Sequence, residues 1–133
     1  MIIDTHCHID MLESPEAYLR KQEQDGGITI GMTNLPSHFE MGYSHFKNLK
    51  YSRLALGYHP LMVASNPNEL SLFKKNLSKT SYIGEIGLDF SREGIRSKEK
   101  QVSLLRKILE CISGERKIVS VHSRRAEREL YGL

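Results

Sequence analysis

The chain has 133 residues, which is enough for one domain with its own hydrophobic core, and residues 1–133 are treated as a single domain. No stretch approaches the roughly 20 apolar residues of a membrane span, and the first residues lack the basic and apolar regions of a signal peptide. The two cysteines form no spaced framework, so we expect a protein of the reducing cytoplasm that does not enter a membrane.

The formal charge of +3 is too small to identify a partner, but it is unevenly distributed. Residues 1–91 carry eight Lys and Arg against ten Asp and Glu, whereas residues 92–133 carry eleven against six. A basic C-terminal third suits a polyanionic substrate such as DNA. A solvated helix face explains the same charges, so charge alone leaves both interpretations open.

Short β-branched runs alternate along the chain with amphipathic stretches. The runs predicted as strands are 2–3, 28–30, 54–56, 82–86 and 118–121. They start near residues 2, 28, 53, 82 and 117, so successive strands are 25 to 35 residues apart. This spacing leaves room for one helix after each strand.

The first two intervening stretches are predicted to be helices. Ser14 is a suitable N-cap, Pro15 suits the first helical position, Glu16 adds an acid to the first turn, and Gly26 can end the helix. In the next stretch, aromatic residues repeat at helical spacing between residues 39 and 46.

The later stretches also show helical patterns. Asn66 is expected to cap a third helix, with Glu69 at its third position. The clearest apolar stripe consists of Val102, Leu105, Leu109 and Ile112. Ser123 is expected to cap a last helix.

A β-α unit repeated five times predicts an α/β fold with a parallel sheet and crossover helices. Eight such units would need roughly 230 residues, close to the size of a (β/α)₈ TIM barrel. The expected fold is therefore a partial (β/α)₈ barrel of about five parallel strands. Five strands cannot close a barrel at normal tilt, so the first and fifth strands are expected to be open edges.

The strongest chemical signal is Asp4-Thr5-His6-Cys7-His8 at the end of the first strand. Because side chains alternate along a strand, His6 and His8 point the same way and Cys7 points away. Two imidazoles this close can bind one divalent ion, although a hydrogen-bonded pair of histidines would give the same pattern.

Histidine or glutamate also follows three other strands, at His59, Glu85 and His122. The carboxyl ends of barrel strands form the face where active sites lie, and packing does not require these residues there. Gly84 and Gly87, which flank the carboxylate, indicate a close approach of the backbone to another group. The sequence therefore predicts a metal site at this face.

These motifs resemble the TatD family of metal-dependent hydrolases, within the amidohydrolase superfamily. The resemblance covers the whole chain in order, and the motifs that carry it are Asp4-Thr5-His6-Cys7-His8-Ile9-Asp10, Gly57-Tyr58-His59-Pro60, Gly84-Glu85-Ile86-Gly87-Leu88-Asp89 and Val121-His122-Ser123-Arg124. The fuller wording of these motifs, including residues 122–126, resembles most the TatD-like nuclease of Qat-type anti-phage defence systems.

The resemblance implies a metal-dependent phosphodiesterase that cleaves DNA with one or two divalent ions, Zn, Mg or Mn. Carried over to this sequence, His6 and His8 hold the first metal, Glu85 bridges both metals and acts in catalysis, and His122 holds the second. In the same family, the residue at His59 lies beside the scissile phosphate, which gives it a catalytic and substrate-binding role. Arg124 is expected to contact a phosphate.

The family also uses a histidine after strand six and an aspartate after strand eight, and five β-α units contain neither. We therefore expect a truncated domain with three possible outcomes. A second copy or a partner chain supplies the missing strands, or the chain forms an open, flattened α/β sheet, or it keeps the local fold without the full site. Two alternatives stay open. One is a catalytically incomplete subunit or interaction module with a vestigial metal site, and the other is a metal-dependent hydrolase of an amide or lactone.

Single residues around these motifs are expected to support the site or the fold. Asp4 is expected to support the metal ligands, and Asp89 either orients a ligand or caps the following loop. Cys7 is expected to be buried by packing, and His38 and His45 to lie on the surface.

Overall fold

The computed structural model describes residues 1–133, and its five strands all run parallel. They are β1 (Ile3–Cys7), β2 (Ile28–Gly31), β3 (Ser52–Leu54), β4 (Tyr82–Asp89) and β5 (Ile118–Arg124). Hydrogen bonds order them as a three-stranded sheet, β1-β2-β3, and a two-stranded sheet, β4-β5. A parallel bridge between Leu56 and Ile83 joins the two sheets, so the expected parallel α/β architecture is confirmed.

Five α-helices and four short 3₁₀ turns connect the strands. The helices are α1 (Pro15–Asp25), α2 (Pro36–Phe46), α3 (Leu70–Asn76), α4 (Lys98–Ile112) and α5 (Glu127–Tyr131). The 3₁₀ turns are Ile9–Met11, Pro60–Met62, Leu77–Lys79 and Ile95–Ser97. A helix follows each strand, as the alternating pattern predicts. None of these helices combines the length and apolar character that crossing a membrane requires.

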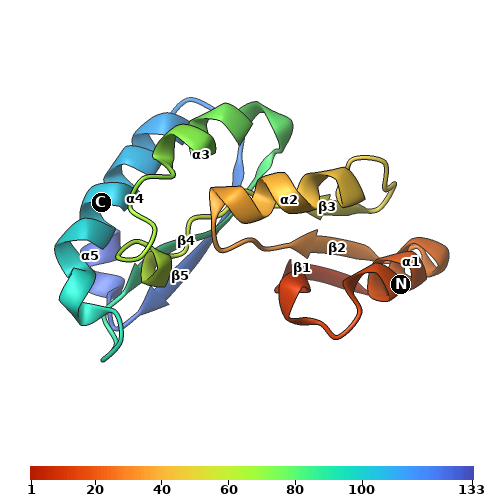
Figure 1. Ribbon diagram of the computed structural model, residues 1–133, viewed down its shortest axis with the longest axis horizontal. Coiled ribbons are helices and arrows are strands. Elements are labelled where there is room, and N and C mark those ends of the chain that lie inside the picture. The colour runs from red at the N-terminus through yellow and green to blue at the C-terminus, as the bar shows by residue number, and fades with distance from the viewer.

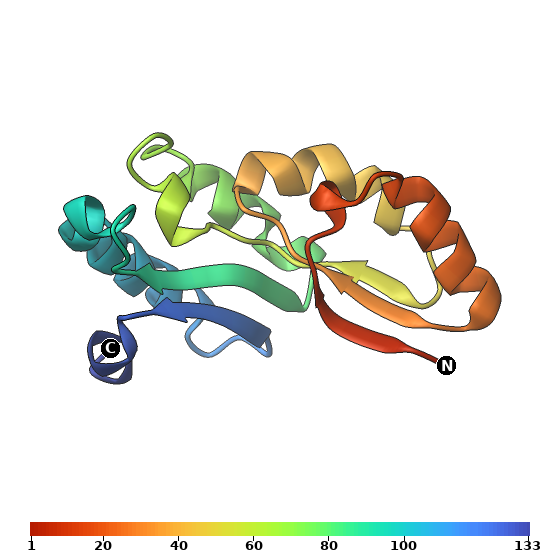
Figure 2. The same cartoon turned by 90° about the horizontal axis from the view of Figure 1, so that it is seen from below.

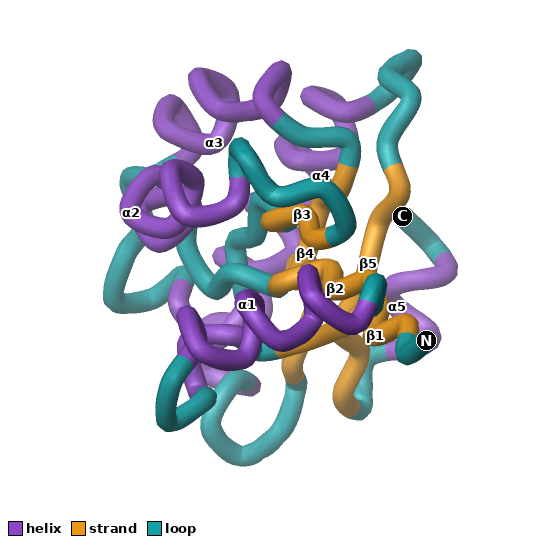
Figure 3. The backbone as a smooth tube through the Cα atoms, turned by 90° about the vertical axis from the view of Figure 1, so that its right-hand side faces the viewer, coloured by secondary structure: helices purple, strands orange, loops and turns teal.

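The helices α1 to α4 cover one face of the curved sheet, and the opposite face is largely bare (Figure 2). Figure 1 shows α3 and α4 side by side over the β4–β5 end. In Figure 3 the strands gather at the centre, with α2 and α3 to one side of them. The main core of 18 buried residues contains side chains from both layers, among them Phe39 of α2, Phe73 of α3 and Ile86 of β4. A much smaller cluster of three, Ile30, Met32 and Ala55, lies apart from it.

Two helix boundaries show how local chemistry sets the elements. Pro15 begins α1 directly after Ser14, and Gly26 ends it in the left-handed conformation with φ of 69°, as predicted. The third helix differs from the prediction, because α3 begins at Leu70 rather than after Asn66. Asn66 instead uses its side chain to hold the carbonyl of Met62.

The last helix also starts later than predicted. Its N-cap is Ala126, not Ser123, because Ser123 belongs to β5. The Ser123 hydroxyl instead donates a hydrogen bond to Glu127 in the first turn of α5 (3.1 Å).

The buried face of α4 is rotated from the predicted stripe. Leu105 is buried as expected, but Leu104, Ile108 and Gln101 are also buried, whereas Val102 is only partly buried. Gln101 is 1% exposed because its side-chain amide accepts from the backbone N–H of Asp89 and donates to the Asp89 carbonyl. The spacing of apolar residues cannot predict the burial of a polar side chain that hydrogen-bonds the end of a neighbouring strand.

Glycine is required where strands meet near the centre of the sheet. A Cβ on Gly57 would lie 1.7 Å from the carbonyl oxygen of Thr33 and 2.6 Å from the backbone nitrogen of Glu85. Gly87 has φ of 143°, and a Cβ there would lie 2.0 Å from the carbonyl oxygen of His122. The close approach that the sequence predicts around Glu85 is therefore an approach of neighbouring strands to one another.

The edge strands are exposed. β1 pairs only with β2, and β5 pairs only with β4. Ile3 is 56% exposed, Ile118 is 66% exposed and Val121 is 46% exposed. The open edges expected for five strands are therefore present.

Candidate metal centre

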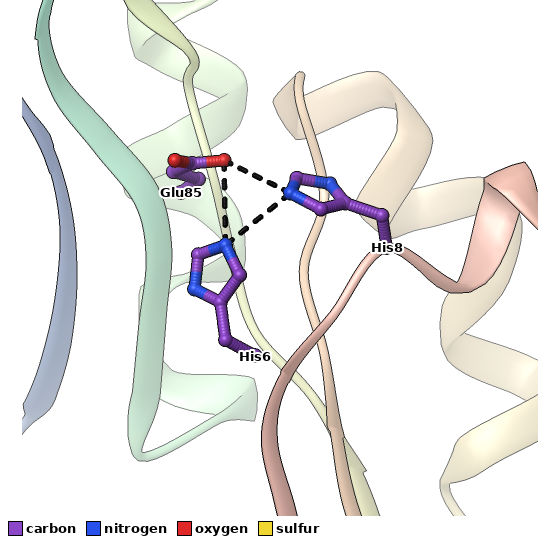
Figure 4. Close-up of side chains that lie close together, drawn as sticks. All are labelled: His6, His8 and Glu85. Atoms are coloured by element: carbon purple, nitrogen blue, oxygen red, sulfur yellow. Dashed lines mark hydrogen bonds and ion pairs between the residues drawn. The ribbon is translucent and has the colours of Figure 1, made fainter. Parts of the chain in front are cut away.

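Three of the predicted ligands converge from two separate strands. His6 lies on β1, His8 follows directly after it, and Glu85 lies in the middle of β4. Figure 4 shows the two imidazoles and the carboxylate facing one another. The Nε2 atoms of His6 and His8 are 3.2 Å apart, and they lie 3.6 Å and 3.3 Å from Glu85 Oε2. Alternation on β1 brings the imidazoles together, as predicted, and leaves Cys7 between them buried.

A second group of potential ligands shares the same carboxylate. His122 Nδ1 lies 2.9 Å from Glu85 Oε1, and His59 Nε2 lies 3.8 Å from Glu85 Oε2. The ligand atoms of His59, Glu85 and His122 are all within 4.8 Å of one another. Glu85 is therefore surrounded by four imidazoles and no lysine or arginine pairs with it, although the carboxylate is only 5% exposed.

The donor set fits a divalent cation. Four tetrahedral ligand atoms at bond lengths of 2.0–2.1 Å lie about 3.3 Å from one another. The three distances in the group of His6, His8 and Glu85 are 3.2, 3.3 and 3.6 Å. Three lone-pair atoms that converge without a cation or a shared set of protons repel one another, so these residues fit a bound metal ion.

His59 is held as a hydrogen-bond donor toward the site. The backbone N–H of Leu61 donates to its Nδ1 (3.1 Å), and burial lowers the pKa of His59 below its ordinary value. A neutral imidazole whose Nδ1 accepts a hydrogen bond carries its proton on Nε2, the atom that faces Glu85. This geometry favours the predicted place of His59 beside a substrate oxygen over a place among the metal ligands.

Asp89 orients His122. Asp89 Oδ2 lies 2.8 Å from His122 Nε2, on the opposite side of the ring from Glu85. Burial alone would raise the pKa of Asp89, but hydrogen bonds from Ser91 and His122 outweigh it and lower the pKa. The charged carboxylate therefore accepts a hydrogen bond from the protonated Nε2, which leaves the unprotonated Nδ1 to face Glu85. The sequence left open whether Asp89 orients a ligand or caps its loop, and the structure shows both contacts, since Oδ1 accepts from the Ser91 N–H.

Ser120 holds His6 in the same manner, and sequence reasoning missed it. The Ser120 hydroxyl forms a hydrogen bond of 2.7 Å with His6 Nδ1, across from β5 to β1. Ser120 precedes His122 by two residues, so both side chains lie on one face of β5. That two-residue spacing is the only signal in the sequence that could have identified it.

Arg124 lies two further residues along β5 and shares the face of Ser120 and His122 at the carboxyl end of the strand. It is exposed, and neither it nor the neighbouring arginines pair with a carboxylate. These exposed arginines lie at or after the carboxyl ends of β4 and β5, and they are Arg92, Arg96, Arg124, Arg125 and Arg128. We call this set the arginine rim.

The remaining single-residue expectations divide between the fold and the surface. Asp4 Oδ1 accepts the backbone N–H of His6, which supports the first group of ligands. Burial raises the pKa of the Cys7 thiol, in keeping with a packing role. His45 is exposed as expected, whereas His38 is partly buried.

Comparison with known proteins places these motifs in one family. The family model described as TatD related DNase matches residues 3–133. A relative from Buchnera aphidicola, described as an uncharacterized metal-dependent hydrolase, is 26% identical, and the match covers 92% of this chain and 49% of the relative. A second relative with the same description, from Methanocaldococcus jannaschii, is 26% identical, with 98% of this chain and 54% of the relative covered.

Two solved structures share the fold. The chain superposes on the TatD homologue YJJV from Escherichia coli with a TM-score of 0.81 at 29% identity, covering 97% of this chain and 53% of that one. It superposes on a TatD family hydrolase from Entamoeba histolytica with a TM-score of 0.75 at 22% identity, covering 98% and 52%. The chain thus spans about half the length of the proteins it matches.

Proposed function

Because the chain belongs to the TatD related DNase family, we propose that it carries the first part of the active site of a metal-dependent phosphodiesterase that hydrolyses DNA. The observation that carries the proposal is the convergence of His6, His8, Glu85 and His122 at distances suited to metal ligands. Residues from three strands meet there although up to 116 positions separate them, from 6 to 122.

The residues divide the work of such a reaction among themselves. His6, His8 and Glu85 would hold one metal, and Glu85 and His122 would contribute to a second. When bound, a divalent cation supplies positive charge to the phosphodiester and lowers the pKa of a water molecule. His59 would donate a hydrogen bond from its Nε2–H to a phosphate oxygen, and Asp89 keeps the His122 ring in position.

The arginine rim supports DNA as the substrate. Its five guanidinium groups are exposed and lack carboxylate partners, and Arg124 lies on the same face of β5 as His122. Unpaired cations beside a phosphodiesterase centre favour a polyanion by releasing its counterions. A solvated helix face accounts for the basic residues of α4, but the arginine rim is spread over the loop after β4, the end of β5 and the short helix α5.

The test is cleavage of end-labelled single- and double-stranded DNA by the purified chain with Mg²⁺, Mn²⁺ or Zn²⁺ added. We expect cleavage that a chelator abolishes and that is absent from the Glu85→Gln variant. Metal-dependent cleavage that persists undiminished in Glu85→Gln would refute the role of the shared carboxylate.

A second candidate is an interaction module that keeps the ligands without turnover. The observation that favours it is the second group, where only Glu85 and His122 are oriented as ligands while His59 is held as a donor. Solution mass and metal content per chain separate the two. A metal-loaded chain, alone or as a dimer, that cleaves DNA supports the enzyme, whereas stable binding of a partner chain with no cleavage supports the module.

The substrate class and biological setting need their own tests. A panel of amide and lactone substrates distinguishes a nuclease from another hydrolase of the superfamily. The proposed defence role rests on the resemblance of the motifs, including residues 122–126, and phage plaque counts for the wild type and for Glu85→Gln would check it.

A further inference from the structure

A polar cavity lies at the end of the strands opposite to the candidate metal centre. It has a volume of about 290 Å³ and lies between the end of α2, the starts of β3 and β4, and the segment that leads into β5. Along β4, the cavity residue Tyr82 precedes Glu85 by three positions, about 10 Å at 3.3 Å per residue. The cavity is therefore separate from the site already described.

The cavity contains an uncompensated positive charge. Four of its lining residues are cationic, Lys47, Arg53, Lys79 and Lys117, and none is acidic. The Glu40 carboxylate, which lies outside the cavity lining, is already paired with Lys75 at 2.9 Å and accepts a hydrogen bond from Asn76 at 3.1 Å. Four cations around one cavity repel one another, which an anion in the cavity would relieve.

Two of these cations are fixed in place by the backbone. Nη1 of Arg53 donates to the carbonyl oxygens of Leu49 (2.9 Å) and Ser52 (2.8 Å). Lys117 Nζ donates to the carbonyl oxygens of Leu77 (2.7 Å) and Thr80 (2.8 Å). These bonds leave Nε and Nη2 of Arg53 and the third proton of Lys117 without a protein partner. A ligand therefore meets donors that are already oriented.

A third cation is also held close to the cavity. Lys79 Nζ lies 5.3 Å from the ring centroid of Tyr43, which limits where the ammonium group can lie. The hydroxyls of Ser78 and Ser81, which also line the cavity, make no hydrogen bond within the protein. Oriented cations with free hydroxyl donors suit a compact oxyanion with several acceptor atoms.

We propose that this cavity binds the phosphate group of a small phosphorylated ligand. A phosphate dianion accepts several hydrogen bonds at once and matches the fork geometry of a guanidinium group. The volume is at the lower end of small-molecule sites, so the ligand is inorganic phosphate or a mononucleotide rather than a nucleic-acid strand. The proposal does not depend on the proposed nuclease activity.

The experiment measures binding of inorganic phosphate and of a 5′-mononucleotide by calorimetry, with the protein kept metal-free by a chelator. The test variants are Lys79→Gln alone and Arg53→Gln with Lys79→Gln. The matched control is Arg106→Gln with Lys107→Gln, which removes the same charge from exposed positions of α4 outside the cavity. Circular dichroism checks that each variant folds. If the double variant does not fold, the single variant Lys79→Gln, at an exposed position, still tests the proposal.

We expect saturable binding to the wild-type chain, weakened about 10-fold or more in the double variant and unchanged in the control. Tighter binding of the mononucleotide than of phosphate would identify a nucleotide ligand, and equal binding would identify free phosphate. Absence of saturable phosphate binding, or equal weakening in the variant and its control, would overturn the proposal. Weakening by Glu85→Gln instead would assign the anion to the metal centre and also overturn it.

Discussion

The two groups of ligands around Glu85 differ in how the protein holds them. In the first group, the His6 and His8 side chains are 38% and 34% exposed and lie on or just after an edge strand. In the second group, the His59 and His122 side chains are 13% and 22% exposed. The protein also holds both second-group rings by hydrogen bonds: His59 accepts from the Leu61 N–H, and His122 donates to Asp89.

This difference indicates a division between a preformed group and a less constrained one. Asp89 is 1% exposed and is held in turn by Ser91 and Gln101, so His122 is positioned before any metal binds. His6 depends on one hydroxyl from Ser120, and His8 Nδ1 is buried without a hydrogen-bond partner. Loss of a single contact should therefore affect the two groups unequally.

The largest effect is expected for Glu85→Gln, which removes the carboxylate common to both groups. The neutral amide keeps the shape but loses the charge that the four imidazoles face. Loss of a hydrogen-bond partner of a ligand typically lowers metal affinity about 10- to 100-fold. Loss of the shared ligand itself should lower the affinity of both groups by more than that, so the metal content of the purified chain should fall. Elemental analysis of the purified chain measures it, and full metal content in the variant would contradict a shared ligand.

Replacement of both first-group histidines, His6→Ala with His8→Ala, is expected to remove one metal and spare the other. The His122 side keeps its contacts with Glu85 and Asp89. Metal stoichiometry before and after the change tests this separation. His38→Ala with His45→Ala, a pair outside both groups, is the control, and an unchanged stoichiometry in the first variant would show that His6 and His8 bind no metal.

A smaller effect on the second group alone is expected for Asp89→Asn. The amide keeps an acceptor for the Ser91 N–H but loses the negative charge that holds the His122 Nε2 proton. Metal affinity at this group should fall about 10- to 100-fold, measured by competition with a chelating dye. Equal weakening of the first group would mean that Asp89 acts on the fold rather than on His122.

The smallest effect is expected for Ser120→Ala, which removes the hydroxyl that contacts His6 Nδ1. A single neutral hydrogen bond contributes about 0.5–1.5 kcal/mol, so first-group affinity should fall about 2- to 10-fold. Ser123→Ala on the same strand is the control. If Ser120→Ala lowered the metal affinity of the second group more than that of the first, Ser120 would not act through His6.

Much of this arrangement could be predicted from the sequence, because the relevant signals are periodic or lie at strand ends. His6 and His8 alternate with a buried cysteine, and Glu85 and His122 lie in β-branched runs that the chain repeats. The resemblance to the TatD motifs additionally predicts which residues of the successive strands belong to one site. Their roles as metal ligands stay predictions that the variants above test.

Other features could not be predicted because they depend on contacts distant in sequence. Gln101 is a polar residue in an amphipathic helix, and only the position of the Asp89 backbone explains its burial. Ser120 has no distinguishing neighbour, and its contact with His6 spans 114 residues. The start of α3 at Leu70 reflects an alternative partner for Asn66, which local propensity cannot reveal.

The seam between the two sheets has a consequence for stability. β1 pairs only within the first sheet, yet His6 and His8 face Glu85 in the second. The backbone hydrogen bonds that join the two sheets run between β4 and Thr33, Leu56 and Tyr58, and none of them involves β1. A metal ion bound by all three side chains would therefore link β1 of the first sheet to β4 of the second. At a concentration a hundredfold above its dissociation constant, it would add about 2.7 kcal/mol to the free energy of unfolding. The melting temperature of the chain is therefore expected to rise with the supply of metal, and in Glu85→Gln to stay constant.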